Sequence, residues 1–240
     1  MARINGFLGR RNFLKLAGMV SIGTTAASCN LLKSIQPNVV AGVNLANPES
    51  ISPNEALQRL IDGNNRFIQQ KRTYPDQSLE RLQLVAKAQY PFAAILGCAD
   101  SRVPTELIFD QGIGNLFVVR VAGNVVNDII LGSLEYATSI LGSPLIVVLG
   151  HRRCGAVAEA IKNEFLPGKI GNVVEGIKPA IAKAKLVTGD MNENAIIANI
   201  QYQADKLQKN STILAQLVGK GKLKVVGASY DIETGKITIV

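Results

Sequence analysis

The stretch Leu145-Ile146-Val147-Val148-Leu149-Gly150 is a run of apolar residues closed by a glycine. Similar short apolar runs occur at residues 92–96, 117–121 and 223–227. Segments of helix length lie between or beside them, around residues 128–141, 155–165, 172–187 and 192–218. Continuous apolar strands that alternate with helices are typical of a parallel sheet with both faces covered. We therefore predict an α/β fold with a mostly parallel sheet flanked by helices.

The two ends of this domain carry their own signals. Ser52-Pro53-Asn54-Glu55 has a cap, a proline and an acid where helices begin, and helical spacing continues to Ile68 with an interruption at Gly63. A second helical pattern runs from Ser78 to about Gln89, which gives an N-terminal helical arm. Residues 231–235 indicate a hairpin turn that adds an antiparallel edge strand near the C-terminus. The predicted catalytic domain spans residues 52–240.

The charge of the chain is mild once its first residues are set aside. The formal net charge is +8, but four basic residues and no acidic one lie in residues 1–28, so the remainder has 22 basic and 18 acidic residues. No compact Lys/Arg run occurs in the body, and Trp is absent. We therefore expect no nucleic-acid partner.

Residues 1–28 have the pattern of an export signal. Arg10-Arg11 is followed by Asn12-Phe13-Leu14-Lys15 and then by a weakly apolar run, Leu16 to Ala27. This resembles a twin-arginine signal peptide, and the run is shorter than the roughly 20 residues that a membrane-spanning helix needs. The alternative is an amphipathic helix with a chance arginine pair.

Ala26-Ala27-Ser28-Cys29 resembles a lipobox, in which Cys29 is lipidated and becomes the first residue of the mature protein. Cleavage after Ser28 or Ala41 without lipidation is the alternative. Residues 29–51 lack a clear period and suit a flexible tether. These segments predict export across the cytoplasmic membrane to the periplasm or cell envelope, with a lipid anchor at the membrane surface.

With Cys29 set aside, the remaining Cys and His residues of the chain are Cys98, His151 and Cys154. Each follows an apolar run, so all three are expected at the carboxyl edge of the sheet, where α/β proteins place their sites. Two Cys and one His with an open fourth position form a catalytic zinc set. The alternatives are cysteines that serve as small buried hydrophobes and a Cys98–Cys154 disulfide.

Asp100 and Arg102 lie two and four residues beyond Cys98 on the same turn. A carboxylate there can accept a hydrogen bond from zinc-bound water, or coordinate the zinc and block it. The guanidinium of Arg102 suits a bidentate pairing that keeps Asp100 ionised and oriented. An unrelated surface ion pair is the alternative.

Over residues 52–240 the chain resembles the β-class carbonic anhydrases. The family's Cys-x-Asp-Ser-Arg element stands at 98–102 and its His-x-x-Cys-Gly element at 151–155. Further stretches that are similar to the family lie at residues 62–67, 117–124, 133–137 and 226–231.

The resemblance implies reversible hydration of CO₂ to bicarbonate and a proton by hydroxide on a zinc held by Cys98, His151 and Cys154. Zinc lowers the pKa of its bound water to roughly 7. Asp100 would orient the hydroxide and Arg102 would orient Asp100. The residues implied in the substrate pocket, which subunits of the family share within a homodimer or tetramer, are Gln89, Phe117, Tyr136 and Gly155.

The resemblance also points to a subgroup. One subgroup closes its zinc with the aspartate and has a Trp three residues before the first Cys, where this chain has Ile95. The plant-like, open-site subgroup is therefore favoured, although Ala122 replaces its usual valine. The main departure is Arg152-Arg153, two cations that either draw anions to the site, alter access or are merely solvated.

Two other functions remain open at this point. One is a poorly active zinc-containing subunit that binds bicarbonate or regulates a membrane complex. The other is a carbonyl sulfide or carbon disulfide hydrolase of the same family. His151 is the only histidine, so no free imidazole remains to carry the product proton outward, and turnover should depend on buffer.

Overall fold

The computed structural model describes residues 51–240. The predicted signal peptide, the lipobox and all but the last residue of the predicted tether lie outside these residues. Within the described part of the chain, no helix is long and apolar enough to cross a membrane.

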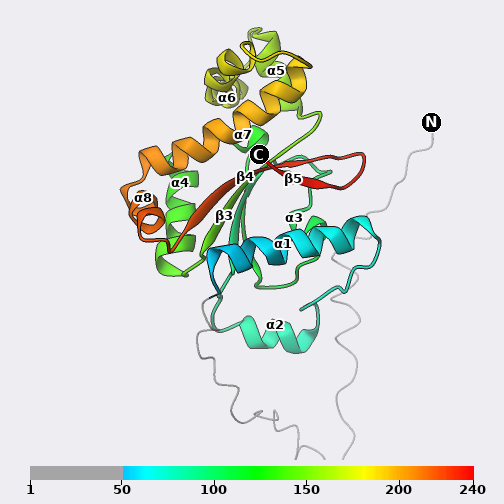
Figure 1. Ribbon diagram of the computed structural model, residues 1–240. Helices are drawn as coiled ribbons and strands as arrows, with labels where there is room; N and C mark the ends of the chain where they lie inside the picture. The colour runs from blue at the N-terminus through cyan, green and yellow to red at the C-terminus, as the bar shows by residue number, and fades with distance from the viewer. Residues whose placement is uncertain (1–50) are drawn as a thin grey trace, which may run out of the picture. The chain divides into compact units, whose positions relative to one another are not determined.

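The centre of the domain is a five-stranded sheet in the order β2-β1-β3-β4-β5 (Figure 1). The first four strands are parallel and β5 runs antiparallel to β4 at the edge, which confirms the predicted sheet and hairpin. The strands are β1 (Ala93–Gly97), β2 (Leu116–Arg120), β3 (Leu145–His151), β4 (Lys224–Tyr230) and β5 (Ile237–Ile239).

Helices cover both faces of this sheet. Their bounds are α1 (Pro53–Ile68), α2 (Leu79–Val85), α3 (Thr105–Ile108), α4 (Asp128–Glu135), α5 (Gly155–Lys162), α6 (Ile170–Ala184), α7 (Met191–Asn210) and α8 (Thr212–Gly219), with a 3₁₀ turn η1 (Ala122–Asn124) and a π turn η2 (Tyr136–Ile140). Side chains that alternate along β1 enter two cores: Ala94 and Leu96 pack with residues of α4 to α8, whereas Ala93 and Ile95 pack with residues of α1 and α3. Figure 1 shows α1 and α7 on opposite sides of the sheet.

Two helix boundaries differ from expectation. Gly63 does not interrupt α1, because the missing side chain lets the helix contact the backbone beside it; a Cβ there would lie 1.8 Å from the carbonyl oxygen of Phe109. The segment 192–218 is two helices, since Ser211 has extended backbone angles and its hydroxyl accepts the N–H of Leu214, which caps α8.

β1 and β3 are hydrogen-bonded neighbours with Gly97 opposite Leu149. The loops that follow them therefore meet at the same edge of the sheet, and these loops carry the residues singled out above.

Candidate metal centre

Cys98, His151 and Cys154 converge in one buried cluster, as predicted. Cys98 follows β1, His151 is the last residue of β3, and Cys154 is the N-cap residue of α5. One ligand atom from each residue lies within 4.8 Å of the others, and all three residues are buried. Both cysteines are free, so the disulfide alternative does not describe this structure.

The ring of His151 has one nitrogen occupied and one without a partner. Nδ1 lies 2.9 Å from the carbonyl oxygen of Arg152, and because a carbonyl only accepts, Nδ1 carries the proton. Nε2 is buried and has no hydrogen-bond partner among the described residues. A buried imidazole nitrogen normally has a partner, and a hydrogen-bonded Nδ1 is how proteins present Nε2 to a metal. The donor set therefore fits zinc.

The two cysteines differ in how readily they lose a proton. A hydrogen bond from Cys154 lowers the pKa of Cys98 to about 4 against the opposing effect of burial, with help from backbone N–H groups that include Gly123, 3.4 Å from the sulfur. The hydrogen bond to Cys98 and burial raise the pKa of Cys154. Cys98 therefore forms a thiolate readily, whereas the negative charge of that thiolate opposes ionisation of Cys154. A dication between the two sulfurs would favour the thiolate form of both.

Asp100 lies beside this cluster and is held by Arg102. Its Oδ1 accepts the backbone N–H of Arg102 and the Nε–H, both at 2.9 Å, and its Oδ2 accepts the terminal guanidinium nitrogen at 2.8 Å. The Arg102 side chain thereby holds the pKa of Asp100 well below its usual range. Oδ2 is also 3.8 Å from Nε2 of His151. The predicted pair is present, and its carboxylate borders the cluster.

Arg120 is a further contributor that the sequence did not single out. From the end of β2, its Nε donates to the carbonyl oxygen of Cys98 at 3.0 Å and its terminal nitrogen donates to that of Asp100 at 2.6 Å. It therefore ties the turn that carries both residues to the neighbouring strand. Its place in the stretch 117–124 was the available signal, but nothing in that pattern says that the side chain turns toward Cys98.

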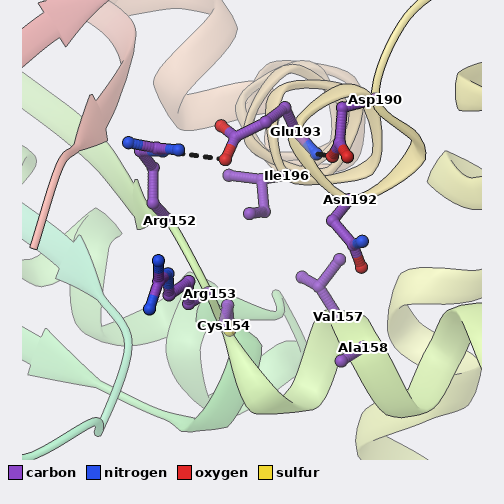
Figure 2. A pocket seen from close by; sticks show the side chains of 9 residues that line it. All are labelled: Arg152, Arg153, Cys154, Val157, Ala158, Asp190, Asn192, Glu193 and Ile196. Atoms are coloured by element: carbon purple, nitrogen blue, oxygen red, sulfur yellow. Dashed lines mark hydrogen bonds and ion pairs between the residues drawn. The ribbon is translucent and has the colours of Figure 1, made fainter.

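Arg152 and Arg153 are not free cations. Arg152 contacts Glu193, Asp231 and Glu233, and Arg153 also pairs with Glu233. The two arginines line a cavity of about 570 Å³ together with Cys154 and residues of α5 and α7 (Figure 2). Because acidic side chains already neutralise them, the expectation that this pair draws anions loses its basis.

The predicted pocket residues are divided. Gly155 follows Cys154 directly and opens α5. Gln89 lies in the loop before β1, and Phe117 lies opposite Ala94, whereas Cys98 follows the other end of β1. At about 3.3 Å per residue, Phe117 is roughly 13 Å from Cys98 along the strands. Tyr136 accompanies Phe117, with ring centroids 6.3 Å apart. One chain alone does not bring these three residues to the cluster.

The chain is similar to known proteins over most of its length. Residues 93–237 match a family described as "Carbonic anhydrase". The carbonic anhydrase of Mycolicibacterium smegmatis is 37% identical over 192 residues, which cover 78% of this chain and 93% of that protein. Carbonic anhydrase 2 of Mycobacterium tuberculosis is 38% identical with the same coverage.

Solved structures agree with the sequence relatives. The structure of the beta-carbonic anhydrase CcaA superposes with a TM-score of 0.62 at 29% identity, covering 76% of this chain and 94% of that one. A tetrameric beta-carbonic anhydrase from Sordaria macrospora gives a TM-score of 0.61 at 25% identity, covering 78% and 97%.

Proposed function

The chain belongs to the β-class carbonic anhydrase family, and we propose that Cys98, His151 and Cys154 hold the zinc ion of this enzyme. The expected reaction is the hydration of CO₂. The observation that carries this proposal is the buried Nε2 of His151, which has no hydrogen-bond partner within residues 51–240 and shares a cluster with two cysteines. When bound, zinc supplies the Lewis acidity that makes water a nucleophile near neutral pH.

The protein's own groups orient the reactants. Asp100 has an oxygen at the edge of the cluster, where it accepts a hydrogen bond from the water that is added to CO₂. Arg102 keeps this carboxylate ionised and fixes its plane through two parallel N–H donors. His151 is the only histidine and is committed to the cluster, so the product proton leaves through Asp100, a water chain or buffer.

We place the protein in the open-site, plant-like subgroup. The contacts with Arg102 occupy both oxygens of Asp100, which supports a role as acceptor over one as a fourth ligand. Ile95 in place of the tryptophan of the closed subgroup supports the same assignment.

A second copy of the chain completes the substrate pocket in this proposal. Gln89 precedes β1, and Phe117 lies opposite Ala94 with Tyr136 beside it, whereas the cluster follows the other end of β1. Tyr136 is 46% exposed, and the neighbouring Ile129 and Ile140 are 79% and 69% exposed, a surface that a second subunit would bury. We therefore expect a homodimer or a tetramer, and light scattering tests this.

Export and lipid anchoring are also part of the proposal, and they rest on the sequence of residues 1–29. Fractionation of expressing cells, with the mass of the mature N-terminus, tests them. A Cys29→Ser variant should appear without the lipid mass and outside the membrane fraction.

The activity is tested by stopped-flow CO₂ hydration with zinc content measured on the same samples. We expect rapid hydration and one zinc per chain in the wild type, loss of both in Cys98→Ser, and retention of both in the control Cys29→Ser. One zinc per chain with little hydration would point to the regulatory subunit instead. Faster turnover of carbonyl sulfide or carbon disulfide than of CO₂ would point to the related hydrolase.

A further inference from the structure

The side chain of Arg152 joins three parts of the fold. Its Nε donates to Glu193 of α7 at 2.8 Å, and one terminal nitrogen lies 3.3 Å from Asp231 and 3.5 Å from Glu233 in the β4–β5 hairpin. Arg153 also pairs with Glu233. Figure 2 shows Arg152 reaching across to Glu193 at the rim of the cavity beside Cys154. Two arginines therefore face three carboxylates from two separate elements.

The backbone of the same residue contacts the metal cluster. The carbonyl oxygen of Arg152 accepts the proton on Nδ1 of His151 at 2.9 Å. Its N–H donates to the carbonyl oxygen of Tyr230 at 2.9 Å, which continues the β3–β4 ladder by one residue. The side chain anchors the residue on one side and the ladder anchors it on the other, so the direction of the carbonyl is fixed. That direction sets the plane of the imidazole and its tautomer.

We infer that Arg152 is a positioning residue for the metal centre: its ion cluster with Glu193, Asp231 and Glu233 fixes the carbonyl that orients His151 toward the metal. This inference rests on the proposed zinc role of His151. Arg152 thereby gains a structural role, although the Arg152-Arg153 pair departs from the sequence pattern of the family.

The competing explanation is that Arg152 forms only a surface ion pair with no effect on the metal centre. Single exposed pairs contribute little to stability, and Arg152 is 35% exposed. The chain offers a suitable comparison in Lys178 and Glu175, an exposed pair with a 2.6 Å contact between two residues of α6. Arg152 differs from Lys178 in two ways. Its guanidinium connects α7 to the β4–β5 hairpin, and its backbone carbonyl accepts the hydrogen bond from the proposed metal ligand His151.

The test uses zinc-loaded full-length protein and two measurements besides activity. The first is the rate of zinc transfer to an excess of a chromogenic chelator. The second is the ¹⁵N spectrum of protein labelled in the histidine ring, which contains a single imidazole because His151 is the only histidine. The variants are Arg152→Met, Arg152→Lys and Glu193→Gln, with Lys178→Met as the matched control.

We expect Arg152→Met to release zinc about tenfold faster, at the lower end of the effect of removing a partner of a metal-binding histidine. Its Nδ1–H signal should shift and exchange faster with solvent. Arg152→Lys should lie between this variant and the wild type, because an ammonium cannot bridge the acids as a guanidinium does. Lys178→Met should match the wild type in both measurements.

Release rates and histidine spectra of Arg152→Met that equal those of the wild type would overturn the inference. If Arg152→Met does not fold, as judged by circular dichroism, Glu193→Gln decides, since it leaves the arginine in place; a wild-type release rate there also overturns the inference. A wild type that binds no zinc would instead refute the proposed function, so the two failures are distinguishable.

Discussion

Substitution of Gly123 by alanine tests how closely the turn beside Cys98 is packed. Gly123 lies in η1 with φ at 66°, a left-handed conformation that costs a residue with a side chain roughly 1–2 kcal/mol. Its N–H points at the sulfur of Cys98, and its carbonyl accepts Nδ2 of Asn199 at 3.0 Å. The turn is therefore held from two sides and has little freedom to relax.

The added Cβ would also meet α6 and α5. It would lie 2.6 Å from Cδ1 of Ile177 and 3.2 Å from the Cβ of Ala156. Overpacking of this kind costs about 1–3 kcal/mol. With the backbone contribution, we expect Gly123→Ala to lower the free energy of unfolding by about 2–5 kcal/mol.

Urea unfolding of zinc-free protein at one fixed concentration measures this change, and Gly142→Ala is its control. Gly142 has φ at 76° and open space around the missing Cβ, so the control should lose only the roughly 1–2 kcal/mol of backbone strain. Ile177→Val removes the crowding atom, so Gly123→Ala combined with Ile177→Val should be less destabilised than the sum of the single variants. A loss in Gly123→Ala no larger than in Gly142→Ala would refute the reasoning.

Further predictions concern the buried Asp110, Asp100 beside the cluster, removal of the metal and the release of the product proton. Asp110→Asn removes a buried carboxylate that accepts hydrogen bonds from Arg66 and the Thr73–Tyr74 segment, and should cost about 2–4 kcal/mol in urea unfolding at pH 7. Burial raises the pKa of Asp110, but these hydrogen bonds outweigh burial and lower the pKa. Their stabilisation is therefore present above the unfolded pKa near 3.9 and is lost as pH falls through the folded pKa. A stability difference between wild type and Asp110→Asn that persists unchanged at pH 2 would contradict this. Asp100→Asn presents an amide to the donors of Arg102 and should lower kcat for CO₂ hydration on the order of a hundredfold with zinc content unchanged; full activity would exclude the assigned role. Chelation of zinc should lower the melting temperature of the wild type, and zinc at about a hundred times its dissociation constant should restore about 2.7 kcal/mol, whereas Cys98→Ser should respond to neither. Turnover should rise with buffer concentration at constant pH and ionic strength, and a flat response would contradict the lack of an internal proton carrier.

Much of the fold followed from the apolar runs. The run from Leu145 is the centre of the sheet because its side chains enter a core on each face, which is the physical cause of an uninterrupted apolar pattern. The resemblance and the strand ends together located Cys98, His151 and Cys154. The Asp100–Arg102 pair was also predictable, because both members lie on one tight turn and need no distant element to meet.

What the sequence did not reveal depends on contacts between distant segments. Gly63 looked like a helix interruption, since local propensity says nothing about a carbonyl that approaches from Phe109. The side chain of Arg120 could not be assigned without knowing that β2 ends beside Cys98. For Arg152 the sequence leaves attraction of anions, altered access and solvation open, because the acidic partners that decide its role lie 41 to 81 positions away.

The order of the strands also dictates when the metal centre can exist during biosynthesis. Cys98 leaves the ribosome more than fifty residues before Cys154, and the two meet only after β1 and β3 have paired. A nascent chain that ends before Cys154 therefore lacks one of the three ligands, and capture of an ion by all three has to follow the pairing of β1 with β3. For the proposed zinc site, the supply of metal that matters is therefore the one in the compartment where β1 and β3 pair.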